Sequence, residues 1–293
     1  MATATLTVGV FPVVRDLVSL TKPRVSLLVI LTCAAGMAIA PGSIGLGRIL
    51  LMMLGMVLVV GSANVLNCYL ERESDGLMRR TEKRALPAGR LPPPLALGFG
   101  LALATVSLPM LLSVNTATGL LGILALFLYV GVYTPMKSRS PEAMVVGAVP
   151  GALPPLMGWT AVTAAVDAGA LVLFGILFLW QMPHVIGLSC YRKAEYVRAG
   201  IRVLPAVRGD RMAKWHALGW AMLLLPVSAW LVPLGVAGPL YGTAAILLGL
   251  AYVAVILRGF RSEAGEPWGR RLFLVSLFYL PLLFMSLMFD ALV

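Results

Sequence analysis

Long runs of apolar residues recur along the chain, separated by shorter polar stretches. Each run is about 20 residues long and does not alternate between polar and apolar positions, which is typical of helices that cross a bilayer and not of β-strands. We therefore predict an all-α, polytopic membrane protein. The nine predicted transmembrane ranges are 25–42, 46–68, 94–113, 117–135, 142–163, 169–190, 214–233, 238–258 and 271–291.

The positive charges of the chain fall on one side of this predicted topology. All of the 23 Lys and Arg residues except Arg48 lie before the first range or in the connections after ranges 2, 4, 6 and 8, including the range ends that border these connections. Lys and Arg are enriched in cytoplasmic loops. This distribution predicts a cytoplasmic N-terminus and a C-terminus on the opposite side.

Composition narrows the class of protein further. The chain is 60% hydrophobic and only 12% charged, with a net charge of +11, whereas soluble domains are about 45–50% apolar and about 25% charged. We attribute the positive charge to cytoplasmic loops and expect no nucleic-acid partner. The three cysteines form no CxxC pair, and the first residues resemble neither a signal peptide nor a transit peptide. A bacterial inner (plasma) membrane is the expected location.

A polar stripe follows directly on the second apolar range. Asn67, Glu71 and Asp75 are four residues apart, so on a helix they share one face over roughly 12 Å. Carboxylate and amide oxygens are ligands that suit Mg²⁺, and nearby cations suit phosphate oxygens. The stripe predicts a magnesium-bound diphosphate at this helix end, although a solvated helix end with mixed charges is the plainer interpretation. The cations that follow it are Arg79, Arg80, Lys83 and Arg84.

A second polar stretch spans the end of the sixth apolar range. It contains His184, one of two histidines in the chain. A histidine near a helix end is most often a hydrogen-bonded packing residue, but a buried imidazole is also a candidate iron ligand or proton-transfer group. Glu195, further along this stretch, could join the magnesium site from the opposite half of the molecule. Arg192 and Lys193 precede Glu195, and we assign both to diphosphate binding.

Two shorter motifs carry further candidates for a phosphate contact. Tyr133 and Lys137 end the fourth apolar range at i, i+4 spacing, so both side chains face the same way. Lys22 and Arg24 flank Pro23 immediately before the first range. The plainer interpretation is an interfacial tyrosine with a snorkelling lysine, and a positively charged flank of a transmembrane helix.

Taken together and in order, these motifs resemble the UbiA superfamily of intramembrane prenyltransferases, and within it the branch that makes haem O. The resemblance covers nearly the whole chain, which is then a single domain over 1–293. The landmarks are Thr21-Lys22-Pro23-Arg24, Asn67 to Asp75 with Met78-x-Arg80-Thr81-x-x-Arg84, Tyr133-Thr134, Pro154-Pro155-Leu156-x-Gly158-Trp159, Met182-Pro183-His184 and Ala199-Gly200-Ile201-x-x-Leu204-Pro205.

The resemblance implies a nine-helix horseshoe around a cavity open to lipid. It also implies Mg²⁺-dependent loss of diphosphate from farnesyl diphosphate, with a vinyl group of haem B capturing the farnesyl cation. In that case Asn67, Glu71, Asp75 and Glu195 are the catalytic and metal-binding residues, and His184 contacts haem. Haem A synthase or assembly of a terminal oxidase would use the product. Glu71 stands where the family usually has Asp, and Ala199 stands where many members carry a further acid.

Three rival functions remain at this point. One is a UbiA-type enzyme that prenylates another acceptor, such as an aromatic acid or a chlorin. The second is a secondary transporter, but transporters place ionisable groups near the bilayer midplane, whereas these acids cluster at one face. The third is a non-catalytic assembly factor, suggested by Glu71 in place of Asp.

Overall fold

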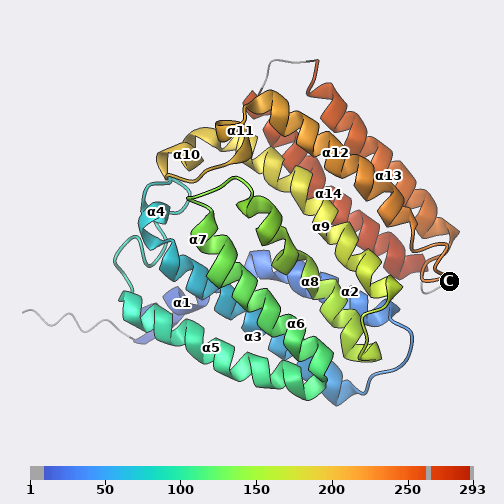
Figure 1. The fold of residues 1–293 in the computed structure, drawn as a ribbon. Coiled ribbons are helices and arrows are strands. Elements are labelled where there is room, and N and C mark those ends of the chain that lie inside the picture. The colour runs from blue at the N-terminus through green and yellow to red at the C-terminus, as the bar shows by residue number, and fades with distance from the viewer. Residues whose placement is uncertain (1–9, 262–264, 291–293) are drawn as a thin grey trace, which may run out of the picture.

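The computed structural model describes residues 10–261 and 265–290, and every regular element within these ranges is a helix. Figure 1 shows long helices packed side by side, with short helices gathered at one end of the bundle. The elements are α1 Val10–Leu20, α2 Pro23–Ile39, α3 Leu46–Leu70, α4 Arg72–Gly76, α5 Pro93–Val114, α6 Thr116–Leu126, the π-helix η1 Phe127–Tyr133, α7 Thr134–Met136, α8 Ala143–Thr163, α9 Ala168–Tyr191, α10 Lys193–Arg198, α11 Leu204–Val207, α12 Asp210–Ala229, α13 Pro239–Arg258 and α14 Gly265–Asp290.

Seven of the described helices are long and apolar enough to cross a membrane: α3, α5, the continuous segment Thr116–Met136, α8, α9, α13 and α14. The predicted all-α membrane fold is thus confirmed, while the count of nine spans stays a prediction. The two remaining ranges are helical but differ from the others. The apolar part of α2 is short, covering Ser26–Ile39, and α12 begins with the charged segment that includes Asp210 and Arg211.

The helix ends follow local sequence rules. Pro23, Pro93 and Pro239 begin α2, α5 and α13, where the missing N–H has no intrahelical partner to lose. The side chains of Asn115 and Asp167 accept hydrogen bonds from Thr118 N at 2.9 Å and Ala170 N at 3.1 Å. These caps satisfy backbone donors at the starts of α6 and α9.

The long helices pack in two connected groups. In one group α3 lies against α5 and α2 lies against α8; in the other, α9 contacts α12 and α14. The two groups meet where α8 packs on α9 (Figure 1). Close crossing of α2 and α8 depends on Gly158, because a Cβ there would collide with the carbonyl oxygen of Cys33. Small residues that let backbones approach are typical of helix packing in membranes.

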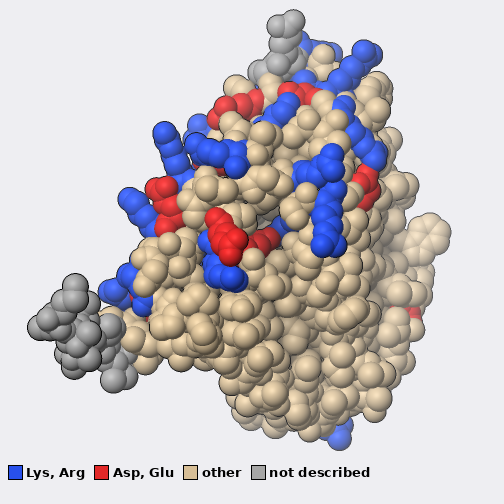
Figure 2. Space-filling model, turned by 60° about the vertical axis from the view of Figure 1, so that its left-hand side comes forward, with Lys and Arg blue, Asp and Glu red and all other residues tan. Residues whose placement is uncertain are grey.

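The charged residues gather at one end of this bundle. Figure 2 shows Lys, Arg, Asp and Glu around a hollow there, whereas the flank below is almost uncharged. The long helices expose apolar side chains such as Leu101, Leu247 and Phe278, a surface that suits a lipid bilayer. At the charged end Arg198 Nε donates to Leu77 O at 3.1 Å, which joins the segments that follow α9 and α3.

Candidate active site

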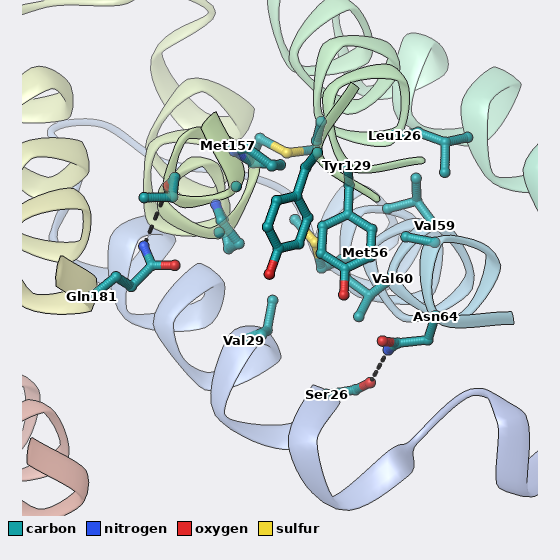
Figure 3. A pocket seen from close by; sticks show the side chains of 18 of the residues that line it. Ser26, Val29, Met56, Val59, Val60, Asn64, Leu126, Tyr129, Met157 and Gln181 are labelled. Atoms are coloured by element: carbon teal, nitrogen blue, oxygen red, sulfur yellow. Dashed lines mark hydrogen bonds between the residues drawn. The ribbon is translucent and has the colours of Figure 1, made fainter. Parts of the chain in front are cut away.

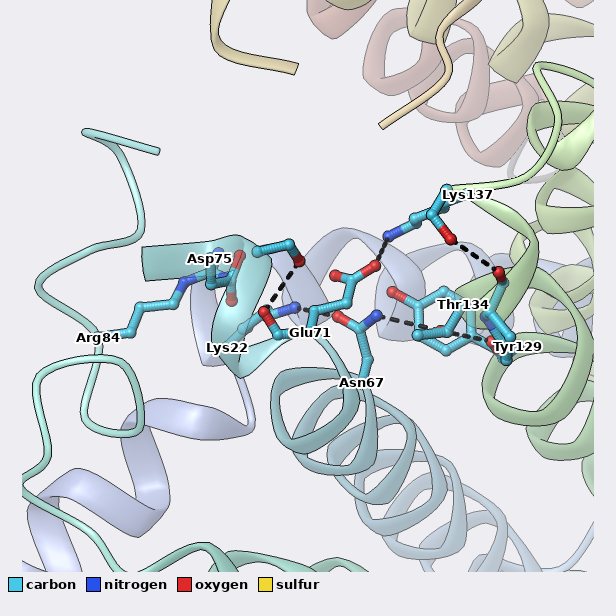
Figure 4. A network of polar contacts seen from close by, with 11 residues as sticks. Lys22, Asn67, Glu71, Asp75, Arg84, Tyr129, Thr134 and Lys137 are labelled. Carbon is cyan, nitrogen blue, oxygen red and sulfur yellow. Dashed lines mark hydrogen bonds and ion pairs between the residues drawn. The ribbon is translucent and has the colours of Figure 1, made fainter. Parts of the chain in front are cut away.

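The predicted stripe of oxygen ligands lines one cavity at the charged end. Asn67 lies in the last turn of α3, Glu71 caps this helix and Asp75 lies in α4. The long helix ends at Leu70, but Glu71 N donates to Asn67 O at 2.9 Å and Asp75 N donates to Glu71 O at 2.8 Å. Helical spacing is therefore kept across the break, and all three side chains border a polar cavity of about 170 Å³ (Figure 4).

Asn67 is fixed by hydrogen bonds on both sides of its amide. Lys22 Nζ donates to Asn67 Oδ1 at 3.0 Å, and Asn67 Nδ2 donates to Thr134 Oγ1 at 3.1 Å. The side chain is only 1% exposed. Lys22 precedes α2 and Thr134 begins α7, so this amide connects three segments of the chain. Its oxygen faces the Lys22 ammonium, a cation.

Each carboxylate of the cavity is paired with a cation. Lys137 Nζ lies 2.7 Å from Glu71 Oε1, and Arg84 Nη1 lies 2.6 Å from Asp75 Oδ2. Asp75 is 2% exposed, so its charge depends on this partner. The pairs in Figure 4 hold cations and acids in contact within the same cavity.

The π-helix η1 places two tyrosines at the inner edge of the polar cavity. Thr134 N bonds to Tyr129 O, five residues back, and Thr134 Oγ1 donates to the same carbonyl at 2.8 Å. Pro135 lacks the N–H that an α-helix would use here, which favours the wider turn. The rings of Tyr129 and Tyr133 lie 5.4 Å apart. The Lys137 ammonium lies 4.5 Å from the Tyr133 ring centre, as the predicted i, i+4 pairing requires.

Burial and neighbouring charges shift the pKa values of the two lysines in opposite directions. Burial lowers the pKa of the Lys22 ammonium, and the nearby cations Arg84 and Lys137 act in the same direction. Burial by itself would also lower the pKa of Lys137, but Tyr133 and the Glu71 carboxylate raise it above its ordinary value. Lys137 is therefore held as a cation, whereas Lys22 loses its proton more readily.

A second, apolar cavity of about 280 Å³ begins directly below the polar one. Four residues border both spaces, namely Tyr129, Tyr133, Met144 and Val185. Figure 3 shows Tyr129 over the apolar cavity, with Val59 and Val60 of α3 and Val29 of α2 around it. A ligand with a charged head and a long apolar tail could therefore occupy both cavities together.

Only some of the predicted phosphate ligands border the polar cavity. Lys22, Arg80, Arg84, Tyr133 and Lys137 border the polar cavity. The remaining ones are not among the residues that border it, and their assignment stays a prediction; they are Arg24, Arg79, Lys83, Arg192 and Lys193.

Glu195 lies apart from the predicted metal ligands. Its carboxylate pairs with Arg192 at 3.1 Å, and both residues border a surface hollow beside α10 that does not include Asn67, Glu71 or Asp75. Lys193 also points to this hollow, where it pairs with Asp210 at 3.0 Å. Any contribution of Glu195 to the polar cavity would require α10 to move.

His184 lies on α9 beside α14 and borders neither of the two cavities. Its Nδ1 is 2.6 Å from Ser276 Oγ, and Ser276 Oγ donates to Phe273 O at 2.6 Å. The single Ser276 hydroxyl proton can serve only one of these two contacts: if it goes to Phe273 O, Ser276 accepts from an Nδ1–H of His184 and the Nε2 lone pair is available. The Trp180 ring stacks on the imidazole at 4.8 Å. The predicted haem contact stays a prediction.

Sequence reasoning assigned no role to three aromatic or cationic residues that border the polar cavity. Tyr129 is the i−4 neighbour of Tyr133, and this spacing could have revealed it. Tyr196 of α10 and Arg202 reach the cavity from the loop after α9. Arg202 N donates to Lys137 O at 2.9 Å, a contact across the two halves that no local pattern signals. Burial raises the pKa of the Tyr196 hydroxyl.

The donor set of the polar cavity can be compared with the needs of a magnesium ion. No group of three or more His, Cys, Asp and Glu side chains suited to a metal occurs in the described part of the chain. Mg²⁺, however, keeps several waters and is usually held by one or two carboxylates together with phosphate oxygens. Glu71 and Asp75 with the amide oxygen of Asn67 fit that requirement, and their cations could move to the phosphate.

Solved structures share this arrangement of helices. A structure of digeranylgeranylglyceryl phosphate synthase superposes with a TM-score of 0.82, with 15% identity over 95% of this chain and 98% of the other. A UbiA homologue from Archaeoglobus fulgidus, bound to GPP and Mg²⁺, gives a TM-score of 0.70 with 16% identity over 93% and 99% of the two chains. The fold is therefore that of the UbiA class of membrane proteins.

Sequence comparison defines the family. The sequence pattern described as the UbiA prenyltransferase family matches residues 29–279, so the chain belongs to this family. The protoheme IX farnesyltransferase of Anaeromyxobacter dehalogenans is 53% identical over 93% of this chain and 92% of its own length. The protein of the same name from Myxococcus xanthus is 49% identical over 95% of each chain.

Proposed function

We propose that the chain transfers the farnesyl group of farnesyl diphosphate to a vinyl group of haem B, giving haem O. The observation that carries this proposal is the direct junction of a polar, cation-lined cavity with an apolar one. The head and tail of a prenyl diphosphate have the same division of polarity. The name shared by relatives at 49–53% identity supports haem B as the acceptor.

The charges of the polar cavity suit the diphosphate head. Among the described residues that border it, five are cationic and two are acidic. The excess of positive charge matches a group with several negative oxygens. Because these cations sit where charge develops on the leaving diphosphate, they lower the barrier to its departure. The cationic residues are Lys22, Arg80, Arg84, Lys137 and Arg202.

Glu71 and Asp75, with the amide of Asn67, would hold a magnesium ion. When bound, the ion supplies a Lewis acid that further neutralises the leaving group. The chain's part is to orient these oxygens: Asn67 is held by Lys22 and Thr134. Substrate binding would draw Lys137 and Arg84 from the carboxylates to the phosphate oxygens.

The two tyrosines at the junction provide an environment for an allylic cation. Tyr129 and Tyr133 border both cavities, and aromatic faces attract cations. Below them the wall is formed mainly by apolar side chains such as Met56 and Val60. A dry pocket delays capture of the cation by water before the acceptor reacts.

Two of the rival functions gain no support from the structure. A transporter would place ionisable groups deep in the bundle, but Glu71 lies at the end of α3 and Asp75 in the short α4 that follows, and membership of a prenyltransferase family favours an enzyme. An aromatic acid or chlorin acceptor lacks support from the relatives, which are named for protoheme.

The asymmetric charge supports an orientation in the bacterial inner membrane. If the charged end faces the cytoplasm, the N-terminus is cytoplasmic, the C-terminus lies outside, and farnesyl diphosphate enters from the cytoplasm. Haem O made there would pass to haem A synthase or to assembly of a terminal oxidase.

The direct test is extraction of haem from a host that lacks its own haem-farnesylating enzyme, with and without expression of this chain. We expect a more hydrophobic haem, heavier by one farnesyl group and one hydroxyl group, only when the chain is present. Its absence in cells that contain the folded protein and both substrates would contradict the proposed function. Prenylation of a different acceptor would favour the rival UbiA-type activity.

A further inference from the structure

The apolar cavity has a measurable depth along the helices that line it. On α3 it extends from Asn64, near the polar cavity, down to Met56. Met56 is eleven residues from Asn67, so the cavity ends roughly 16 Å below the polar stripe at ~1.5 Å of rise per residue. On α8 it extends from Met144 to Met157.

Two methionine side chains close this deep end. Met56 and Met157 are 0% and 1% exposed and are the most deeply placed lining residues of α3 and α8. The methyl carbon of Met157 lies 3.4 Å from the position that a Cβ on Gly122 would take. The side chain of Met157 thus reaches from α8 to α6 at the deep end of the cavity, and Figure 3 shows both methionines among the side chains that line it.

The depth can be compared with an isoprenoid tail. Three isoprene units place twelve carbon atoms in line, which span roughly 14–15 Å when extended, given carbon–carbon bonds of ~1.5 Å. A tail of this length ends at the methionines when its diphosphate lies beside Asn67. A fourth unit would need roughly 5 Å more, on the same bond length, and would meet the fully buried side chains of Met56 and Met157.

We propose that Met56 and Met157 form the floor of the tail cavity and determine the length of the prenyl group, limiting it to three isoprene units. This inference rests on the proposed function only in assigning the cavity to a prenyl tail. Methionine is flexible and fills irregular space, but both side chains are almost fully buried in this structure. The two methionines thereby account for a limit of about fifteen carbons, the length of the farnesyl group in the proposed function.

The test is binding competition between farnesyl and geranylgeranyl diphosphate on purified, membrane-reconstituted protein. Met157→Ala and Met56→Ala should each deepen the cavity and raise the preference for geranylgeranyl over farnesyl diphosphate by about tenfold or more, since one or two methylenes already change discrimination by this factor. Val60→Phe, one turn nearer the mouth, should instead raise the preference for the ten-carbon diphosphate.

Met52→Ala is the matched control. Met52 lies one turn beyond Met56 on the same helix and is equally buried, but it does not border the cavity. It should therefore lose a similar amount of packing with no change in chain-length preference. An unchanged preference in the two floor variants, or an equal change in Met52→Ala, would overturn the inference.

Failure of the proposed function would have a different signature. The wild-type protein could prenylate no haem and still prefer farnesyl over geranylgeranyl diphosphate, with a preference that Met157→Ala reverses. That result would contradict haem farnesylation but support the methionine floor. Haem farnesylation with the same chain-length preference in all variants would support the proposed function and contradict the methionine floor.

Discussion

The polar cavity shows how few residues are needed to orient the amide oxygen of Asn67, which we propose as a magnesium ligand. Asn67 accepts from Lys22 and donates to Thr134, so its amide cannot turn without breaking one of these bonds. Lys22 reaches this position because its backbone is left-handed, with φ of 52°. The following Pro23 disfavours the right-handed helical conformation at Lys22, which separates α1 from α2 and allows the ammonium to point to Asn67.

Lys22 gives the reaction a predicted pH dependence. Burial lowers the pKa of its ammonium, so the charge is present below that lowered pKa and is lost as the pH rises through it. We expect kcat/KM for farnesyl diphosphate to fall on the alkaline side at a lower pH than an ordinary lysine would give. Lys22→Arg, which stays charged, should keep activity to higher pH. The exposed Lys83, changed to Arg, serves as the control; identical profiles for all three proteins would contradict the role of Lys22.

His184 is predicted to act on the acceptor and not on the diphosphate. In the tautomer in which Ser276 donates to Phe273 O and accepts from His184 Nδ1, the Nε2 lone pair is available to haem iron. His184→Ala should weaken haem B binding by about 10–100-fold and Ser276→Ala by about tenfold, as found for ligands and their hydrogen-bond partners, while farnesyl diphosphate binding is kept. An optical titration with haem B measures haem binding, and a competition assay measures binding of farnesyl diphosphate.

Ser286→Ala is the control for Ser276→Ala. Ser286 lies on the same helix and also donates to a carbonyl three residues back, at 2.8 Å, but has no histidine partner. Equal losses of haem and diphosphate binding in His184→Ala, or haem binding in Ser276→Ala that matches Ser286→Ala, would exclude this role.

At the scale of elements, the sequence predicts helices better than their interruptions. Apolar runs locate the long helices because each must satisfy its backbone within the membrane. The i, i+4 spacing of Asn67, Glu71 and Asp75 correctly places them on one cavity, since the spacing survives the helix end at Leu70. The π-helix before Thr134 was not predicted, because a wider turn leaves no periodic signal.

Contacts between elements explain the rest of what sequence reasoning missed. Tyr196 and Arg202 enter the polar cavity only because the loop after α9 folds back on the end of α7. Glu195 precedes Tyr196 directly, yet it points to the opposite side of α10 and pairs with Arg192. This packing decides which of two adjacent residues faces a cavity, and the local sequence does not predict the packing.

The packing of α2 on α8 yields a prediction about stability. Gly158→Ala would press a methyl group against the carbonyl oxygen of Cys33, so the two helices must separate. We expect a loss of about 1–3 kcal/mol in the free energy of unfolding, as for other overpacked sites. Gly98→Ala on α5, where a Cβ meets nothing within 4 Å, should not destabilise the protein. Thermal unfolding in detergent measures the stability of both variants. Equal stability of Gly158→Ala and Gly98→Ala would contradict the close crossing of α2 and α8.

At the scale of the whole molecule, the charged end and the apolar flank predict one orientation. The three native cysteines are buried, so single introduced cysteines can report sidedness. Ser138→Cys, exposed at the charged end, should react with a membrane-impermeant maleimide only after the cells are opened. Ala165→Cys, exposed in the turn between α8 and α9, should react in intact spheroplasts. The reverse pattern would contradict a cytoplasmic charged end.

The most direct test of the central claim is the rate of haem B farnesylation by purified protein as Mg²⁺ is removed and restored. We predict that wild-type activity is lost with a chelator and returns with Mg²⁺, and that Asn67→Ala and Asp75→Asn lower the rate at least about 100-fold, as expected when a group that stabilises developing charge is removed. Glu73→Ala, at an exposed acid of α4, should stay near wild type. Undiminished activity in the chelator, or in either cavity variant, would contradict a magnesium-held diphosphate at this site.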